Sequence, residues 1–188
     1  ANPGELVERL GDEPVEAWQP YWAEAWESGE VLAGQLAARD LSILRVLDLG
    51  CGLGLAGTVA ASRGARVMFA DAAPPALLFA RLNSWPWRER VRLRRLDWRR
   101  DALPRPPFHL IVGADILYDR EDWPFLERFW RRHLHTGGTV LLGEPGRAAS
   151  ACFPGWLSER GWRIERLSAG SSAAPAKGVF ILAATLPR

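Results

Sequence analysis

The stretch Val46-Leu47-Asp48-Leu49-Gly50-Cys51-Gly52-Leu53-Gly54 decides the fold. It is an apolar run with one carboxylate, Asp48, that breaks into three alternating glycines, and a helix-like pattern follows over residues 55–63. A strand, a glycine turn and a helix in this order is how an α/β protein brings bare backbone close to a nucleoside-like ligand. The stretch therefore predicts a first strand, at residues 45–49, in a nucleoside-binding sheet.

The rest of the chain alternates between strand and helix patterns. Further strands are predicted at residues 66–71, 91–96, 108–114, 139–143, 162–167 and 179–186, and further helices at 28–40, 75–84, 122–134 and 153–160. This alternation indicates an α/β fold with a single, Rossmann-like, doubly wound sheet of seven strands, mostly parallel. No helix separates the last two strands, so we expect the last strand to be antiparallel to its neighbour.

Local chemistry predicts three helix boundaries and one loop. Ser28 is the expected N-cap of the helix at 28–40, and Asp122 is the expected N-cap of the helix at 122–134. Thr136-Gly137-Gly138 is expected to end the latter helix. The small-residue stretch 168–178 is expected to form a loop before the last strand.

Length and composition bound the class of protein. The 188 residues suffice for one domain, in which we expect residues 1–40 to form a helical, aromatic segment packed on a core, residues 41–188. Two cysteines without a metal or disulfide pattern favour the cytoplasm, and no apolar run is long enough for a membrane span. The three histidines lack ligand spacing, so no metal is expected. The net charge of +2 argues neither for nor against a nucleic-acid partner.

Two cofactors fit the glycine turn. Gly52-Leu53-Gly54-Leu55-Ala56-Gly57 also matches the dinucleotide pattern of NAD-binding proteins. However, Asp48 lies inside the preceding strand, where a carboxylate disfavours an anionic pyrophosphate. The methionine part of S-adenosylmethionine carries an ammonium and a sulfonium, which a nearby carboxylate attracts. The turn therefore favours S-adenosylmethionine over NAD, with Gly50, Cys51, Gly52 and Gly54 around the methionine part.

Other acids follow the later strands. Asp71 ends the second strand about 17 residues after Gly54, close to the roughly 20 expected for an acid that binds a ribose hydroxyl. Asp97 and Trp98 follow the third strand, where an acid can bind the adenine amino group and an indole can stack on the ring. The alternative is that Asp48 and Asp97 merely cap turns.

Residues 20–147 resemble a known family, the seven-strand class I methyltransferases of the family 16 protein-lysine type. Within that family they are most similar to the electron-transfer-flavoprotein β-subunit lysine methyltransferases. The resemblance rests on the glycine turn, Asp71 and Trp98 and on three further motifs. These are Pro20-Tyr21-Trp22-Ala23-Glu24-Ala25-Trp26-Glu27-Ser28-Gly29, Asp115-x-x-Tyr118, and Gly143-Glu144-Pro145-Gly146-Arg147, which has Glu144 where the family segment has Asp.

The resemblance implies site residues and a reaction. Trp26 and Ala114 match positions beside the cofactor, and Asp115 and Tyr118 match the catalytic acid and aromatic, which would orient an amine and disperse its charge. The implied reaction transfers a methyl group from S-adenosylmethionine to a lysine of a protein, such as electron-transfer-flavoprotein β-subunit, and releases S-adenosylhomocysteine.

Several alternatives stay open. The same fold also serves small-molecule and RNA methyltransferases, and a non-catalytic cofactor-binding scaffold is a third possibility. Asp115 and Tyr118 would then form only a turn that leads into a helix, with Tyr118 packed beneath it. Nine arginines lie between Arg81 and Arg105, interleaved with tryptophans. They suit RNA or an acidic protein, or they form a solvated basic face, which the arginine-rich composition favours.

Overall fold

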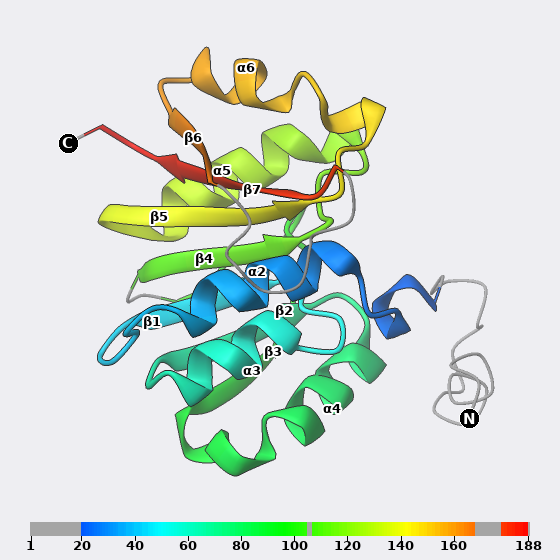
Figure 1. The fold of residues 1–188 in the computed structure, drawn as a ribbon, viewed down its shortest axis with the longest axis vertical. Coiled ribbons are helices and arrows are strands. Elements are labelled where there is room, and N and C mark those ends of the chain that lie inside the picture. The colour runs from blue at the N-terminus through cyan, green and yellow to red at the C-terminus, as the bar shows by residue number, and fades with distance from the viewer. Residues whose placement is uncertain (1–19, 105–106, 168–177, 188) are drawn as a thin grey trace.

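A seven-stranded sheet with helices on both faces forms the centre of the protein (Figure 1). This computed structural model describes residues 20–104, 107–167 and 178–187. The strands are β1 (Arg45–Leu49), β2 (Arg66–Asp71), β3 (Val91–Arg95), β4 (Phe108–Ala114), β5 (Leu134–Glu144), β6 (Arg163–Leu167) and β7 (Phe180–Thr185). The helices are α2 (Glu27–Ala37), α3 (Leu55–Ser62), α4 (Pro74–Asn83), α5 (Trp123–His133) and α6 (Phe153–Ser158). Short 3-10 turns are η2 (Pro20–Ala23), η3 (Trp85–Arg90), η4 (Arg120–Asp122) and η5 (Ala148–Ser150).

The strand order across the sheet is β3-β2-β1-β4-β5-β7-β6. Strands β1 to β5 pair in parallel, whereas β7 runs antiparallel to both β5 and β6, as the arrowheads of β5 and β7 show in Figure 1. This topology confirms the predicted doubly wound sheet. The chain moves outward from β1 through β2 to β3 and then returns to place β4 on the other side of β1. The switch point, where such sheets bind ligands, therefore lies between β1 and β4.

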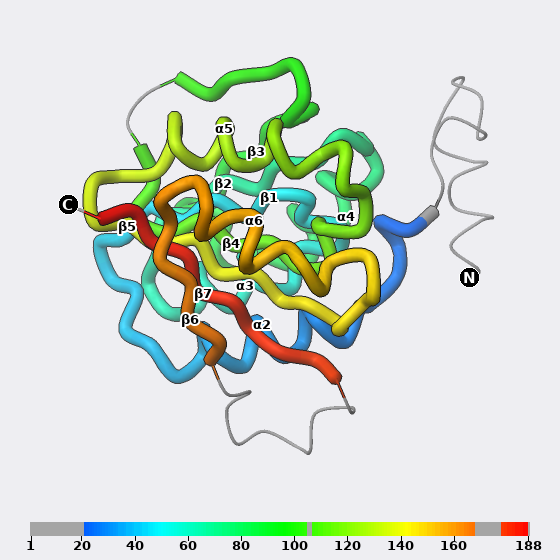
Figure 2. Tube along the Cα trace, turned by 90° about the horizontal axis from the view of Figure 1, so that it is seen from above, coloured from blue at the N-terminus to red at the C-terminus, as the bar shows by residue number. Residues whose placement is uncertain are grey.

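The helices divide between the two faces of the sheet. Helices α2, α3 and α4 pack on one face, in a core that includes Leu32, Ala60 and Phe69, and α5 and α6 pack on the other, around Trp130 and Phe153. Figure 2 shows α2 and α5 on opposite sides of the sheet. Because both faces are covered, β4 is apolar and buried along most of its length.

One helix cap predicted from the sequence is wrong, and the other is confirmed in position only. Ser28 lies inside α2, which begins at Glu27, and its buried hydroxyl has no hydrogen-bond partner among the described residues. Asp122 is the N-cap residue of α5, as predicted, but its carboxylate makes no cap bond. The guanidinium of Arg99 donates a hydrogen bond to that carboxylate instead. At Asp122 a tertiary contact therefore replaces the local cap bond.

The fifth strand is longer than predicted, and the predicted helix stop is wrong. Helix α5 ends at His133, and Thr136, Gly137 and Gly138 lie inside β5 rather than after a helix. The pairing of β4 with β5 shifts register there, and Gly137 has a φ of 78°. The glycines therefore form a bulge in the strand, a local pattern that resembles a helix end in sequence.

The predicted N-terminal segment is described in part. From residue 20 onward it forms η2 and α2, which packs on the sheet: Leu32 and Leu36 of α2 are fully buried. Residues 1–19, and all but the last residue of the loop predicted at 168–178, lie outside the described residues. Within the described ranges, no helix combines the length and the apolar character needed to cross a bilayer.

Helix α3 approaches β1 and β2 so closely that position 57 must be glycine. A Cβ atom on Gly57 would lie 2.3 Å from Cε1 of Phe69 and 2.8 Å from Oδ2 of Asp48. The same carboxylate oxygen accepts a hydrogen bond from the backbone N–H of Gly57 at 2.8 Å. The helix that follows the glycine turn is thus locked to the first strand.

We expect Gly57→Ala to lower the free energy of unfolding by about 2 kcal/mol, because an extra methyl group has no room in this core. Urea unfolding measures the change. Gly155→Ala is the matched control, since Gly155 also lies in a helix and its Cβ would meet nothing within 4 Å. That control should gain a little stability through helix propensity. Equal stability of the two variants would contradict the close packing.

Candidate functional site

The predicted site residues lie at one edge of the sheet, where β1 to β4 have their carboxyl ends. Gly50 follows β1, Asp71 ends β2, Asp97 follows β3, and Ala114 ends β4. Parallel strands present their carboxyl ends at the same edge, and this edge includes the switch point between β1 and β4. The fold therefore brings together residues that are distant in the chain.

Three glycines give the turn after β1 its shape. Gly50, Gly52 and Gly54 have φ values of 64°, 50° and 77°, in the left-handed region that glycine adopts without strain. A Cβ on Gly50 would lie 2.9 Å from Ile116 and 3.4 Å from the ring of Trp98, and one on Gly54 would lie 2.7 Å from Cβ of Ala80. The turn therefore depends on glycine at these positions, both for its backbone conformation and for its close packing against neighbouring side chains.

Asp71 is tied to this turn. Its Oδ2 accepts a hydrogen bond from the backbone N–H of Gly52, and its Oδ1 accepts one from Ala73, both at 2.9 Å. Burial raises the pKa of Asp71, and the backbone hydrogen bonds oppose that rise. Each carboxylate oxygen keeps a second lone pair, so the group can also accept from the two hydroxyls of a ribose.

Asp48 and Asp97 both hold backbone turns, as the alternative interpretation expects. Asp48 is buried and bound to Gly57, and burial raises its pKa to about 7. Asp97 accepts a hydrogen bond from the backbone N–H of Arg99 at 2.9 Å, and its Oδ2 lies 3.7 Å from Nε of Arg100. A structural role is therefore present for each acid, whether or not it also contacts a ligand.

Cys51, Trp98 and Ala114 complete the surroundings of the turn. Burial, followed by the charges of Asp48 and Asp71, raises the pKa of the Cys51 thiol well above its usual range, so it stays protonated. The indole N–H of Trp98 is buried and has no hydrogen-bond partner among the described residues. Ala114 faces α2: a Cβ atom added to Gly29 of that helix would lie 3.7 Å from the Cβ of Ala114.

Asp115, the predicted catalytic acid, is held by an arginine. Asp115 has a φ of 55° and is 7% exposed. Arg147 donates from Nε to Oδ1 at 2.9 Å and from Nη2 to Oδ2 at 2.5 Å, a bidentate pair. The guanidinium also lies 5.6 Å from the ring centre of Trp26, whose indole N–H donates to the carbonyl of Tyr21 at 3.0 Å. Trp26 and Asp115 thus flank one cation.

Glu144 is a further buried acid beside this pair, and sequence reasoning assigned it no role. It is 1% exposed; its Oε2 accepts from the hydroxyl of Ser150 at 2.7 Å, and its Oε1 has no hydrogen-bond partner among the described residues. Burial raises its pKa to about 7, and the charge of Asp115 adds to this effect. In the sequence, the motif from Gly143 to Arg147 was the feature that pointed to both Glu144 and Arg147.

Tyr118 does not pack beneath a turn. Tyr118 is 56% exposed, so the alternative in which it packs beneath the turn is wrong. The neighbouring Asp119 accepts a hydrogen bond with its Oδ1 from the backbone N–H of Glu121 at 2.9 Å, and its Oδ2 lies 3.3 Å from Nη2 of Arg99. Across the described ranges, no group of three or more histidine, cysteine or acidic side chains is placed to hold a metal ion.

The donor set fits a nucleoside with a cationic tail. The glycine turn offers bare backbone, Asp71 offers a pre-positioned carboxylate for a diol, and Trp98 offers an indole with an unused N–H. Asp48 places a carboxyl group beneath the same turn. These features suit S-adenosylmethionine better than the anionic pyrophosphate of NAD.

Comparison with known proteins agrees with the fold and the motifs. The family described as "Lysine methyltransferase" matches residues 20–151. The electron transfer flavoprotein beta subunit lysine methyltransferase of Xenopus laevis is 37% identical over 142 residues, covering 72% of this chain and 56% of that protein. The protein N-lysine methyltransferase METTL21A of Danio rerio is 37% identical over 129 residues, covering 64% of this chain and 58% of that protein. The chain thus spans little more than half the length of these relatives.

Solved structures share the fold at lower identity. The glycopeptide N-methyltransferase MtfA complexed with sinefungin superposes with a TM-score of 0.72 at 18% identity, over 88% of this chain and 89% of that one. N-methyltransferase NodS from Bradyrhizobium japonicum WM9 with S-adenosyl-l-homocysteine gives 0.69 at 19% identity, over the full length of both chains. These likenesses concern architecture alone. Because the family match covers most of its length, the chain belongs to the lysine methyltransferase family.

Proposed function

We propose that this chain transfers a methyl group from S-adenosylmethionine to a lysine side chain of a protein. The observation that carries the proposal is the joint placement of the glycine turn, Asp71 and Asp115 at the carboxyl edge of the sheet, which includes the switch point. Family membership supports the acceptor class, because relatives in two branches are named for protein lysine methylation. Electron-transfer-flavoprotein β-subunit is the proposed substrate, since relatives from Xenopus laevis and Danio rerio carry that name.

The residues divide between the parts of the methyl donor, which supplies an electrophilic methyl group on a sulfonium. Asp71 would accept hydrogen bonds from the ribose. Asp97 and Trp98 would bind the adenine, by amino-group recognition and stacking. The methionine part would lie against the turn residues and its flanks, which are Asp48, Gly50, Cys51, Gly52, Gly54, Trp26 and Ala114.

The acceptor amine would meet Asp115. A lysine has a pKa near 10.4 in water, so it arrives protonated and must lose a proton before it can act as a nucleophile. A carboxylate beside an aromatic ring attracts and orients such a cation. Asp115 and Trp26 already flank a guanidinium in this way. Tyr118, being exposed, would contact the incoming side chain, and alignment of the amine with the methyl group would supply most of the acceleration.

A labelling experiment tests the proposal. The chain is incubated with methyl-labelled S-adenosylmethionine and electron-transfer flavoprotein, and we expect label on lysines of the β-subunit. A thermal-shift series with S-adenosylmethionine, S-adenosylhomocysteine and NAD is run in parallel, and only the first two should raise the melting temperature. Label on RNA or a small molecule alone would contradict the protein acceptor. Tight cofactor binding without transfer to any class would favour a scaffold.

Asp71→Ala should weaken binding of S-adenosylhomocysteine by about 100-fold, because two charge-assisted hydrogen bonds of about 1.5 kcal/mol each are lost. Isothermal calorimetry measures the affinity. Asp40→Ala is a control, since Asp40 is exposed, precedes β1, and accepts with its carboxylate from the nearby backbone N–H of Ser42 at 3.0 Å. If Asp71→Ala bound as tightly as the control, the ribose assignment would be refuted.

Asp115→Asn should keep the affinity for S-adenosylhomocysteine and lower kcat by about 100-fold. An uncharged amide does not attract the lysine ammonium and does not accept a proton from it. Asp119→Asn is the matched control, an acid four residues away with local hydrogen bonds. The control should retain most of its activity. Normal turnover by Asp115→Asn would remove Asp115 from the catalytic residues.

A further inference from the structure

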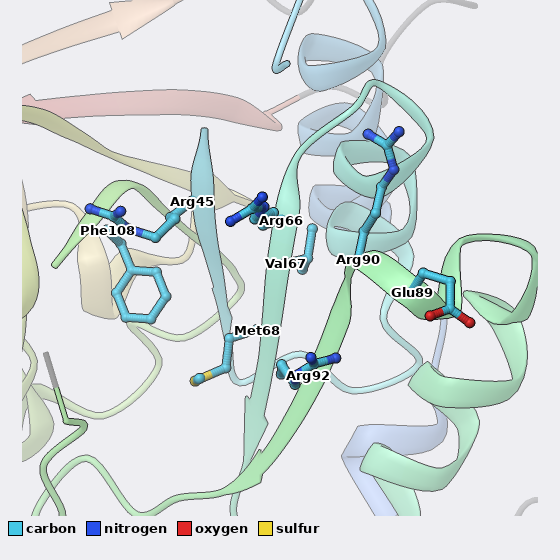
Figure 3. Close-up of a pocket in the computed structure, with 8 residues that line it drawn as sticks. All are labelled: Arg45, Arg66, Val67, Met68, Glu89, Arg90, Arg92 and Phe108. Atoms are coloured by element: carbon cyan, nitrogen blue, oxygen red, sulfur yellow. The ribbon is translucent and has the colours of Figure 1, made fainter. Parts of the chain in front are cut away.

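A basic hollow lies at the opposite edge of the sheet, where the parallel strands begin. It has a volume of about 400 Å³, and Figure 3 shows its lining: Arg45, Arg66, Val67, Met68, Glu89, Arg90, Arg92 and Phe108. Arg45 and Arg66 are the first residues of β1 and β2, and Arg92 is the second residue of β3. Four arginines, one glutamate and three apolar side chains thus line the hollow.

The positive charge of this hollow is not compensated. None of its four arginines forms an ion pair within the described ranges, and Glu89 lies 3.7 Å from Arg88 instead. At the other edge, by contrast, Arg99 and Arg147 both pair with aspartates. The whole chain has a net charge of only +2, so four arginines without an acidic partner in the described part of the chain form a local excess of positive charge.

Three of the guanidiniums are fixed in place by backbone carbonyls. Arg45 Nε donates to Pro107 at 2.9 Å, Arg90 Nη1 donates to Gly64 at 2.8 Å, and Arg92 Nη1 donates to Val91 at 3.0 Å. Each guanidinium has five N–H donors, so most donors stay available. A pre-positioned guanidinium binds a carboxylate in bidentate geometry with little loss of side-chain entropy.

A second hollow extends the basic surface along β3 toward α4. It has a volume of about 310 Å³, shares Arg92 with the first, and is also lined by Arg81 and Arg88. The Arg88 guanidinium lies 5.2 Å from the ring centre of Trp85, which is exposed, as is Leu82. Arginine and tryptophan are enriched in surfaces that bind other proteins.

The chemistry favours acidic polypeptide over RNA. Proteins that bind single-stranded RNA commonly stack its bases on exposed aromatic rings. Phe108 is the aromatic residue that lines the first hollow, and it is buried, while the second hollow has no aromatic residue in its lining. Trp85 is exposed, but it lies outside both linings. Forked guanidiniums over apolar patches match carboxylates that alternate with apolar side chains.

We propose that the two hollows dock an acidic segment of the protein that presents the lysine. The inference rests on the proposed function and deepens it by naming a feature of the substrate. The strands between the two edges have five to seven residues. At about 3.3 Å per residue, the hollows lie roughly 20 Å from the carboxyl edge. A single substrate protein can therefore contact the hollows and the carboxyl edge at the same time.

Fluorescence anisotropy with two labelled probes tests the docking surface: a peptide that alternates glutamate with leucine, and an oligouridylate of equal charge. The wild-type chain should bind the peptide more tightly than the RNA, and added salt should weaken that binding. Arg66→Glu/Arg92→Glu should weaken peptide binding by about tenfold or more. Arg128→Glu/Arg132→Glu, which reverses two exposed charges on α5, is the matched control and should bind like wild type.

The wild type and the two charge-reversed variants should bind S-adenosylhomocysteine with equal affinity. If Arg66→Glu/Arg92→Glu does not fold, Arg66→Gln/Arg92→Gln replaces it. With a protein that the wild-type chain methylates as substrate, Arg66→Glu/Arg92→Glu, the hollow variant, should have a KM about tenfold higher and an unchanged kcat. Equal peptide binding by hollow variant and control, or tighter binding of the RNA, would overturn the proposal. Absence of transfer to every protein would count against the proposed function, while the peptide result would still decide the docking surface.

Discussion

The carboxylate of Asp48 accepts a hydrogen bond from the backbone of Gly57, in a space that no side chain at position 57 could share. This contact joins β1 to α3, the helix that follows the glycine turn, and fixes the length and path of the turn between them. The turn then places the N–H of Gly52 against Asp71, which aligns the end of the second strand with the first. The geometry of the candidate cofactor site follows from that junction.

The sequence predicted those parts of the fold that depend on local pattern. β1, β2 and β4 have the predicted bounds, because a buried parallel strand is an uninterrupted apolar run with a sharp end. The errors fall where distant residues decide the local structure. Asp122 reads as a cap but binds Arg99, and the glycines at 137 and 138 read as a helix stop but lie in a bulge against β4.

The candidate site was predictable in position but not in its pairing. The acids at strand ends are visible in the chain, and the parallel order brings them to one edge. The pair between Asp115 and Arg147 joins residues 32 apart, and the bond between Glu144 and Ser150 depends on a short turn after β5. Motif matching points to such segments but not to their partners. Arg147 neutralises Asp115, so an incoming lysine ammonium must share or displace a cation that is already bound there.

The parallel sheet also separates charge. Arginines begin β1 and β2 at one edge of the sheet, and the acids at or next to the ends of these strands, Asp71 and Asp48, lie toward the other. β1 and β2 therefore share this polarity, and Arg92 near the start of β3 adds to the basic edge. A substrate with an acidic segment and a lysine roughly 20 Å apart has the complementary polarity, and long-range attraction would orient it before contact. The arginines at the amino edge therefore bear on which lysine reaches Asp115, although they lie far from it.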